Sequence, residues 1–331
     1  MGDQRPTSHD IAKAAGVSQT AVSLVLRGKA DGNISAENQE KIRAVADRLG
    51  YRPNRAAREL RSGTATSIGL LIPDVTDPFF ASVLRGAQHA AAADGYSMVM
   101  LEGALDTDWE ARAFEAIQSR LVASVLVCAP RGWSNTNPGN LRSKVVVVDP
   151  GRDTDYPAVH LNVADGMRQV AAHLQELGHQ RIGRLRAGIP TDTFALRDAA
   201  FGEHARQWAK IVAVDAEAYS LDAAENAARE LLEAAPVTAV VADTDLLAAG
   251  VYRAARTLGI RIGKDLSATG FDDLDVARIL DPELTTVRID GHEAGRLGTQ
   301  MVLGSIDTGN TSQHIETPLV IRGSTQPASE T

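Results

Sequence analysis

From residue 66 onward, short apolar runs alternate with stretches of helical spacing, and this alternation restricts the chain to few folds. The runs are continuously apolar, as the sequences of buried parallel strands are. Strands separated by helices predict parallel sheets with helices on both faces. Nine or more strands over about 260 residues exceed one typical sheet, so two similar α/β lobes are expected. The runs are 67–72, 96–101, 124–128, 144–148, 158–161, 182–185, 211–214, 238–242 and 266–270.

Residues 7–26, TSHDIAKAAGVSQTAVSLVL, have the pattern of two short helices joined by a tight turn. Thr7 can cap the first helix with Asp10 as its capping-box partner, and Ser18 can cap the second helix. Gly16 can adopt the positive φ that a sharp turn needs. The apolar faces would comprise Ile11, Ala12, Ala14 and Ala15 on the first helix and Val22, Val25 and Leu26 on the second.

The second of these helices would present Gln19, Thr20 and Ser23 outward near its N-terminal end. An apolar inner face with short polar groups at the start of the second helix is the arrangement of a helix-turn-helix. An ordinary helical hairpin would show a similar pattern. A third helix, capped by Ser35 and ended by Gly50, would complete the head with Ile42, Val45, Ala46 and Leu49 inside.

Charge is distributed unevenly along the chain. Residues 1–62 contain eleven Lys or Arg and seven Asp or Glu, which gives this segment a net charge of +4. The whole chain carries −8, so the remaining residues carry −12. A basic head on an acidic body attracts phosphates at one end of the chain and repels them at the other.

Motifs of phosphate binding and catalysis are missing from the sequence. It has no GxGxxG after the first strand, no GxxxxGK[ST], no GxSxG and no HExxH. Cys128 is the single cysteine, which excludes an intrachain disulfide and a thiolate zinc site. Apolar runs stay well short of the roughly 18 residues of a membrane span, and the polar N-terminus lacks a signal-peptide core. These features predict a cytoplasmic protein with no membrane span and with neither a cofactor nor a metal.

Beyond the helix-turn-helix, the chain resembles the lac-repressor/galactose-repressor family of bacterial transcription factors. The resemblance runs in order through YRPNRAARELRSG (51–63), IGLLIPDVTDPFF (68–80), LGHQRIG (177–183), GFDD (270–273) and LTTVR (284–288). It therefore covers nearly the whole chain. The matching residues of the N-terminal part are Asp10, Ala12, Ala15, Gly16, Val17, Ser18, Val22, Ser23, Val25, Leu49, Gly50, Tyr51, Pro53, Asn54, Ala57 and Leu60.

The resemblance implies a domain organisation. An all-α helix-turn-helix head would be followed by an α/β core of two parallel-sheet lobes of the periplasmic-binding-protein type. The chain would cross between the lobes near Ala164, Gly291 and Glu316. The implied segments are 1–52 for the DNA-binding domain, 53–65 for a hinge helix and linker, 66–163 plus 291–315 for the N-terminal lobe, and 164–290 plus 316–331 for the C-terminal lobe.

By the same resemblance, the chain would be a sequence-specific DNA-binding transcriptional regulator, a repressor, controlled by a small polar effector. Two-fold dimers read pseudo-palindromes, so a homodimer on double-stranded operator DNA is expected. Residues 75–86, VTDPFFASVLRG, would pair the N-terminal lobes. Leu60 would wedge into the minor groove. The DNA-binding residues would be Ser18, Gln19, Thr20, Ser23, Asn33, Tyr51, Asn54, Ala57 and Leu60.

The effector would lie in the cleft between the lobes, outside the carboxyl ends of the strands. Strand ends and family positions place Asp74, Phe79, Phe80, Asp149, Arg197, Tyr219, Thr244 and Asp272 there. Carboxylates, one arginine and aromatic faces suit a polyhydroxylated ligand such as a sugar or a nucleoside. Two other classes stay open, namely a sugar-transport receptor without DNA function and an α/β enzyme with a carboxylate pair as acid and base.

Several positions depart from the family pattern. Thr244 stands where relatives usually have Asn, and Ile289-Asp290-Gly291 replaces a stretch that often supplies Gln and an aromatic residue. Arg184-Leu185-Arg186 replaces a Phe-Leu-Gly-Gly-like strand end, where Arg186 would either attract an anionic group or, as we prefer, pair with a carboxylate. Leu24 and a longer loop at 27–33 leave operator preference unpredicted.

Overall fold

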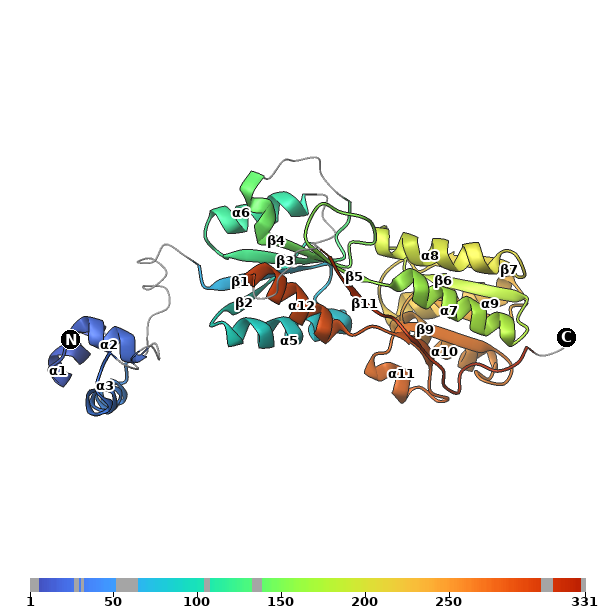
Figure 1. Ribbon diagram of the computed structural model, residues 1–331. Coiled ribbons are helices and arrows are strands. Elements are labelled where there is room, and N and C mark those ends of the chain that lie inside the picture. Colours follow the sequence, from blue (N-terminus) through green and yellow to red (C-terminus); the bar gives the residue numbers. More distant parts are fainter. Residues whose placement is uncertain are drawn as a thin grey trace. The chain divides into compact units, whose positions relative to one another are not determined.

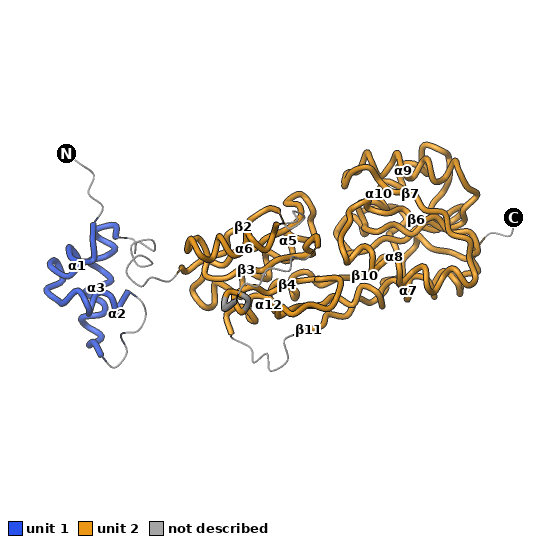
Figure 2. Tube along the Cα trace, turned by 90° about the horizontal axis from the view of Figure 1, so that it is seen from above, with its two compact units in different colours: residues 1–64 blue, residues 65–331 orange. Residues whose placement is uncertain are grey.

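The computed structural model describes residues 6–26, 30, 33–51, 65–103, 108–132, 139–304 and 312–328. The chain divides into two compact units, residues 1–64 and residues 65–331 (Figure 2). Within the described part of the chain, each helix is too short or too polar to cross a membrane. Asn54, Ala57 and Leu60 of the predicted hinge lie outside the described residues.

The head unit contains three described helices, α1 (Ser8–Ala15), α2 (Gln19–Leu26) and α3 (Ala36–Arg48). The predicted helix ends are confirmed. Thr7 and Asp10 form a reciprocal capping box, and Gly16 has a φ of 67° at the turn. Ser18 Oγ accepts the backbone N–H of Ala21 at 3.1 Å and so caps α2. These contacts place α1 and α2 in the expected helix-turn-helix order.

A small apolar core holds the three head helices together. Its buried members are Ile11, Ala12, Ala15, Val22, Val25, Ala30, Ile42, Val45 and Ala46. Two predicted members are wrong, because Ala14 and Leu49 are exposed. Ala14 lies one position off the inward face that Ile11 and Ala15 share at four-residue spacing. Leu49 is the C-cap of α3, and Tyr51, two residues on, packs against the core instead.

Among the described residues, the core unit contains two six-stranded sheets (Figure 1). Sheet A has the order β11 (Ser312–Ile315), β5 (Ala158–Leu161), β4 (Val145–Val148), β3 (Ser124–Cys128), β1 (Ser67–Ile72) and β2 (Ser97–Glu102), with parallel neighbours. Sheet B has the order β12 (Leu319–Val320), β10 (Thr285–Arg288), β9 (Ser267–Asp272), β8 (Ala239–Ala242), β6 (Arg181–Arg186) and β7 (Lys210–Asp215). Its neighbours are parallel except for β12, which runs antiparallel to β10.

The nine predicted apolar runs correspond to β1 to β9, each within two residues of its observed bounds. Strands β10, β11 and β12 were not among the predicted runs. The first of these, TTVR, begins with the buried polar side chains of Thr285 and Thr286. β11 reads SQHI, and β12 has two residues, so none of the three is a continuous apolar run.

Helices cover the faces of both sheets (Figure 1). In the lobe of sheet A, α5 packs against α12, and α6 packs against β1 and β3. In the lobe of sheet B, α7 packs against α8, and α9 against α10. The helices of the core unit are α5 (Pro78–Ala93), α6 (Trp109–Gln118), α7 (Val163–Glu176), α8 (Asp192–Ala205), α9 (Leu221–Ala234), α10 (Asp245–Leu258), α11 (Asp275–Ile279) and α12 (Gly291–Leu303), with the 3-10 helix η1 (Gly139–Lys144) before β4.

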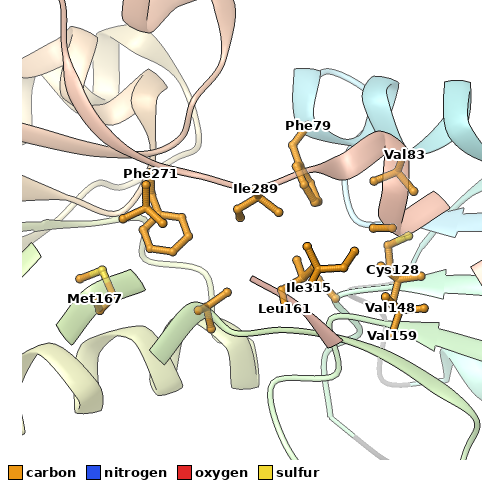
Figure 3. Close-up of a cluster of buried hydrophobic side chains, with 14 of the residues drawn as sticks. Phe79, Val83, Cys128, Val148, Val159, Leu161, Met167, Phe271, Ile289 and Ile315 are labelled. Atoms are coloured by element: carbon orange, nitrogen blue, oxygen red, sulfur yellow. The ribbon is translucent and has the colours of Figure 1, made fainter. Parts of the chain in front are cut away.

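Three chain segments connect the two sheets. The chain passes from sheet A to sheet B after β5, returns after β10 and passes to sheet B again after β11. Leu161, Ile289 and Ile315 come from these three connections and belong to one buried apolar cluster. Figure 3 shows them between Phe271 of sheet B and Phe79 of α5. Apolar packing therefore holds the connections together, while the exact lobe boundaries stay a prediction.

Candidate functional site

A cavity of about 350 Å³ lies between the two lobes of the core unit. Its walls come from the carboxyl ends of β1 to β4 on one side and of β6 to β9 on the other. Open α/β sheets bind ligands at this position. The lining residues are Pro73, Asp74, Asp77, Phe79, Phe80, Glu102, Ala129, Asp149, Ile189, Thr191, Thr193, Phe194, Arg197, Tyr219, Thr244 and Asp272.

The structure brings together all eight side chains that the sequence placed in the cleft. Each of Asp74, Phe79, Phe80, Asp149, Arg197, Tyr219, Thr244 and Asp272 lines this one cavity. The first four come from the lobe of sheet A, and the last four come from the lobe of sheet B. A molecule in the cavity would therefore contact both lobes, and binding of an effector by these residues stays a prediction.

Arg197, on α8, is the buried cation of the cavity. Its guanidinium lies over the ring of Phe271 at 3.9 Å and near the ring of Phe194 at 5.1 Å. Nη1 donates to the carbonyl of Asp243 at 3.0 Å, and Nη2 lies 4.0 Å from Oδ1 of Asp272. Nε is buried and has no hydrogen-bond partner among the described residues. One face of the cation is therefore fixed by aromatic rings, and its buried Nε is a donor that the described residues leave unpaired.

Asp149 and Asp272 are buried carboxyls at strand ends with left-handed backbone angles. Their φ values are 54° and 112°, a conformation that non-glycine residues adopt at some energetic cost. Burial raises the pKa of both carboxyls, and the charge of Arg197 partly opposes this effect. The two carboxyls thus bind protons more readily than exposed ones, and a protonated carboxyl can donate as well as accept hydrogen bonds.

Asp74 and Asp77 add two carboxyls from the lobe of sheet A, to which Asp149 also belongs. Asp77 accepts the backbone N–H of Phe79 at 2.9 Å and thereby caps α5. Burial raises the pKa of Asp77. Asp74 accepts bonds from the backbone and hydroxyl of Thr76 at 2.7 and 2.6 Å. Both carboxylates are thereby oriented by the turn that leads into the helix.

Three buried hydroxyls in the cavity wall are unsatisfied. Thr191 Oγ1, Thr193 Oγ1 and the phenol of Tyr219 have no hydrogen-bond partner among the described residues. Thr193 lies near Asp149, and Tyr219 lies near Asp77, and each hydroxyl partly opposes the rise in the pKa of its neighbouring carboxyl. Buried polar groups are normally paired. These three hydroxyls therefore have hydrogen-bonding capacity that the described residues leave unused.

The remaining predicted residues also have structural contacts. Phe79 and Phe80 meet edge to face, with ring centroids 5.3 Å apart, and both belong to the buried cluster as well as to the cavity wall. Thr244 caps α10 by accepting the N–H of Leu247 at 3.3 Å. Its neighbour Asp245 is fully buried and braces sheet B, accepting from the hydroxyl of Thr286 at 2.6 Å.

Sequence reasoning missed several residues of the cavity, chiefly Asp77, Thr191, Thr193 and Phe194. The last three lie in the segment between the end of β6 and the first turn of α8. Residues that follow the carboxyl end of a parallel strand lie next to the ligand position. The predicted strand at 182–185 could therefore have pointed to these three residues. Asp77 directly precedes the proline that starts α5, so the sequence marks it as a helix cap. That structural role gives no sign that the same carboxyl also lines the cavity.

Arg186 does not line the cavity. Its guanidinium is bound to Asp215, with Nε at 2.6 Å and Nη2 at 2.9 Å from the two carboxylate oxygens. The preferred prediction, pairing with a nearby carboxylate, is therefore confirmed. Throughout the described ranges, His, Cys, Asp and Glu side chains do not gather in threes as metal ligands would. Cys128 is buried, and burial raises the pKa of its thiol.

The head unit presents part of the predicted DNA-binding surface. Gln19 and Thr20 are exposed at the start of α2, and Ser23 is half-buried. Gln19 Nε2 donates to Ser8 Oγ at 2.8 Å, a bond that leaves its amide oxygen available. Asn33 is exposed. An exposed amide and hydroxyl at a helix start suit base edges in a major groove.

Comparisons with known proteins agree with both units. The family described as "Bacterial regulatory proteins, lacI family" matches residues 7–54, and "Periplasmic binding protein-like domain" matches residues 171–325. The chain is 30% identical over 324 residues to the ribose operon repressor of Halalkalibacterium halodurans, covering 97% of each sequence.

Solved structures show the same fold. A lac repressor dimer bound to operator and an anti-inducer matches with a TM-score of 0.82 and 24% identity, over 98% of this chain and all of that one. A lacI-family transcriptional regulator from Enterococcus faecium with bound ribose matches with a TM-score of 0.69 and 25% identity, over 80% of this chain and all of that one.

Proposed function

This chain belongs to the lacI family of bacterial regulatory proteins, and we propose that a neutral polyhydroxylated molecule, a sugar or a nucleoside, controls it from the interlobe cavity. The protein is a DNA-binding transcriptional repressor with a small-molecule effector, and its relatives are regulators rather than enzymes. The finer assignments, namely the effector class, the contact residues and the cytoplasmic location, are our proposal.

The unsatisfied hydroxyls carry the proposal for the effector. In the part of the chain that the structure describes, the side-chain hydroxyls of Thr191, Thr193 and Tyr219 have no hydrogen-bond partner, and the cavity that these residues line also contains buried carboxyls. Hydroxyl groups on a ligand both donate and accept, so they can pair with hydroxyls and carboxyls at once. The rings of Phe79 and Phe80 add an apolar face for a sugar or a base. The E. faecium relative, which was solved with ribose, is consistent with this size and chemistry.

The charge of the cavity argues against an anionic effector. Five carboxyls line it, on Asp74, Asp77, Glu102, Asp149 and Asp272, against the single guanidinium of Arg197. That guanidinium already faces Asp272 and the carbonyl of Asp243. A phosphate or carboxylate on the ligand would meet like charges in a desolvated site.

We assign DNA reading to the head. Gln19 and Thr20 would contact base edges, while Ser18, Asn33 and the basic side chains would hold phosphates. Ser23, Tyr51, Asn54, Ala57 and Leu60 complete the proposed interface, with residues 53–65 as the hinge helix. Leu60 would insert into the minor groove and bend the DNA. A Leu60→Ala variant that binds operator with the same affinity and the same DNA bend would exclude this role.

A homodimer is the proposed assembly on a pseudo-palindromic operator. Residues 75–86 would pair the lobes of sheet A. A second contact is supported in the other lobe, where Ile279 is 79% exposed beside an open groove of about 710 Å³. Tyr252, Ile260 and Leu280 also line this groove. Arg253, Arg256, Arg261 and Asp281 line the groove as well, so it combines apolar and charged side chains as interfaces do. We assign a second copy of the chain as its occupant, because a pseudo-palindromic operator binds a two-fold dimer.

Effector binding would regulate the protein by linking the lobes. Segments 66–163 plus 291–315 and 164–290 plus 316–331 are the proposed lobes, and the cavity draws residues from both. A ligand that prefers one relative orientation shifts the population toward it and changes the spacing of two heads in a dimer. Coupling of this kind is typically about 1–3 kcal/mol.

A thermal-shift screen tests the proposed effector class. The panel is D-ribose, D-glucose, D-galactose, adenosine, uridine and ribose 5-phosphate. A ligand at 100 times its Kd stabilises the fold by about 2.7 kcal/mol, so binders raise the melting temperature clearly. We expect a neutral member to stabilise the protein and the phosphate not to. A phosphate ester that binds more tightly than its parent sugar would contradict the proposal.

A further inference from the structure

Arg184 is an arginine in the middle of a strand, and its side chain is only 1% exposed. Arginine is almost never fully buried unless its charge is paired. Nη2 of Arg184 lies 2.5 Å from Oδ1 of Asp243, and Nε lies 3.5 Å from Oδ1 of Asp198. Nη1 donates at 3.1 Å to the carbonyl of Val241, its partner in the β6–β8 pairing. Two hydrogen bonds therefore fix the guanidinium through Nη1 and Nη2, while the buried Nε has no hydrogen-bond partner among the described residues.

Asp243, the partner of Arg184, connects three elements around the cavity. It directly follows β8, and its second carboxylate oxygen accepts the backbone N–H of Ala187 at 3.0 Å. Its backbone N–H donates to the carbonyl of Leu185 at 3.0 Å. Its own carbonyl accepts Nη1 of Arg197 at 3.0 Å. Asp243 therefore binds Arg184 through its carboxylate and Arg197 through its backbone carbonyl, so one residue connects the two guanidinium groups.

The residues that Asp243 holds are those that face the cavity. Arg197 lines it, and so does Thr244, the residue that follows Asp243 in the chain. Arg184 is not among the lining residues. Removal of Arg184 would leave the carboxylate of Asp243 buried with the backbone of Ala187 as its remaining polar partner, because the charge that balances it would be gone.

We propose that Arg184 is a positioning residue for effector binding, which fixes Arg197 and Thr244 at the cavity wall through Asp243. The inference rests on the proposed function, since it assumes that the cavity receives the effector. The competing explanation is purely structural. In that case the rings of Phe194 and Phe271 would hold Arg197 without help, and Arg184 would affect only the stability of sheet B.

The test compares full-length wild type with Arg184→Met, Arg184→Lys and Arg186→Met. Arg186→Met is the comparison variant, because Arg186 lies two residues along the same strand and its hydrogen bonds go to Asp215. Arg186 shares a longer contact to Asp198 with Arg184 but makes no hydrogen bond to Asp243, so the variant removes a nearby charge without removing that bond. Crystal structures of the four proteins without added ligand give the distance from Arg197 Nη1 to the Asp243 carbonyl. Titration calorimetry with each member of the panel, D-ribose first, gives the Kd. Melting temperatures report stability.

We expect the Arg197–Asp243 hydrogen bond to be lost in Arg184→Met and kept in Arg186→Met. The Kd of a panel compound that binds wild type should rise about tenfold in Arg184→Met and partly recover in Arg184→Lys. If Arg184→Met fails to fold, Arg184→Lys decides by the same two readouts, because it keeps a charge beside Asp243. A lower melting temperature with an intact hydrogen bond and an unchanged Kd would overturn the inference. If no panel compound binds wild type, the proposed effector class fails, while the crystal structures still decide the positioning role.

Discussion

Gly151 and Thr193 lie so close together that a Cβ on Gly151 would be 2.3 Å from the backbone nitrogen of Thr193. Gly151 follows β4 in one lobe, and Thr193 lies in the first turn of α8 in the other. Gly151 also has a φ of 68°, which favours glycine. The two lobes therefore touch backbone to backbone beside the cavity, and only a residue without a side chain permits this contact.

Replacement of Gly151 by alanine should prevent this approach of the lobes. We expect Gly151→Ala to weaken effector binding by about tenfold, or about 1.4 kcal/mol, because ligand contacts from both lobes would no longer form together. Gly178→Ala is the matched control. Gly178 has a similar φ of 80°, but its Cβ would have nothing within 4 Å. Equal losses of affinity in the two variants would assign the effect to backbone strain instead of lobe contact.

Arg197→Ala and Asp272→Asn should remove the response to effector and leave operator affinity without effector nearly unchanged. The coupling lost would be about 1–3 kcal/mol. Burial raises the pKa of Asp272, so its ionised form is disfavoured in the folded protein. We therefore expect Asp272→Asn to keep or raise the melting temperature. An Asp272→Asn protein that melts early and fails to bind operator without effector would make Asp272 a structural residue.

Gln19→Ala should reduce both affinity and specificity for the preferred operator. The expected cost is about 1–3 kcal/mol, the usual value for a side chain that pairs with one base. Binding to a library of operator variants, measured at constant salt, separates the roles. If Gln19→Ala binds every site more weakly by the same factor, Gln19 contacts the DNA backbone.

Stability should fall below pH 6.5 because of His179. This side chain is buried, with Nε2 3.0 Å from the carbonyl of Gln326 and Nδ1 2.9 Å from the hydroxyl of Thr238. Burial lowers the pKa of His179, so the folded state favours the neutral ring. The stabilisation from the neutral His179 ring is fully present above pH 6.5, about the pKa of histidine in the unfolded chain. It is lost as pH falls from there through the lower pKa of the folded state, by at most about 1.4 kcal/mol per pH unit.

Urea unfolding at pH 7.5 and 5.5 measures this contribution. His179→Gln keeps an amide donor toward Gln326 and cannot titrate. Wild type should lose more unfolding free energy on acidification than His179→Gln does. Identical losses in the two proteins would show that other groups cause the acid sensitivity.

Sedimentation should show a dimer at micromolar concentration. Ile279→Glu should weaken it, because a charge would replace an exposed apolar side chain of the proposed interface. Leu121→Glu is the control, since Leu121 is also exposed, at 55%, but belongs to neither proposed contact. A stable monomer or a tetramer in the wild type would contradict the assembly.

Much of the architecture follows from local patterns in the chain. The apolar runs predicted β1 to β9 because parallel strands buried on both faces cannot alternate polar and apolar residues. The caps at Thr7 and Ser18 were also predictable, because the first N–H groups of a helix have no partner within the helix and side-chain oxygens of Ser and Thr accept hydrogen bonds from them. Strand ends, together with positions matched to the resembling family, then predicted the eight residues that line one cavity.

What the sequence could not predict depends on contacts between distant segments. β11 is a strand because it pairs with β5, some 150 residues earlier in the chain, and its own residues, SQHI, give no apolar signal. His179 follows the end of α7, a position where side chains are usually exposed. It is buried because the C-terminal segment at Gln326 covers it. The burial of Arg184 depends in the same way on Asp243, which belongs to another strand end.

The order of segments in sheet A has a consequence for synthesis on the ribosome. Strands β1 to β5 emerge first, but the lobe that they begin lacks its edge strand β11 and the helix α12 until the chain is almost complete. Strands β6 to β9, by contrast, follow one another without a break in sheet B. Contacts between segments far apart in the chain form late. The lobe that is translated first therefore stays incomplete until almost the whole chain is made, because β5 gains its edge partner only when residues 312–315 have been translated.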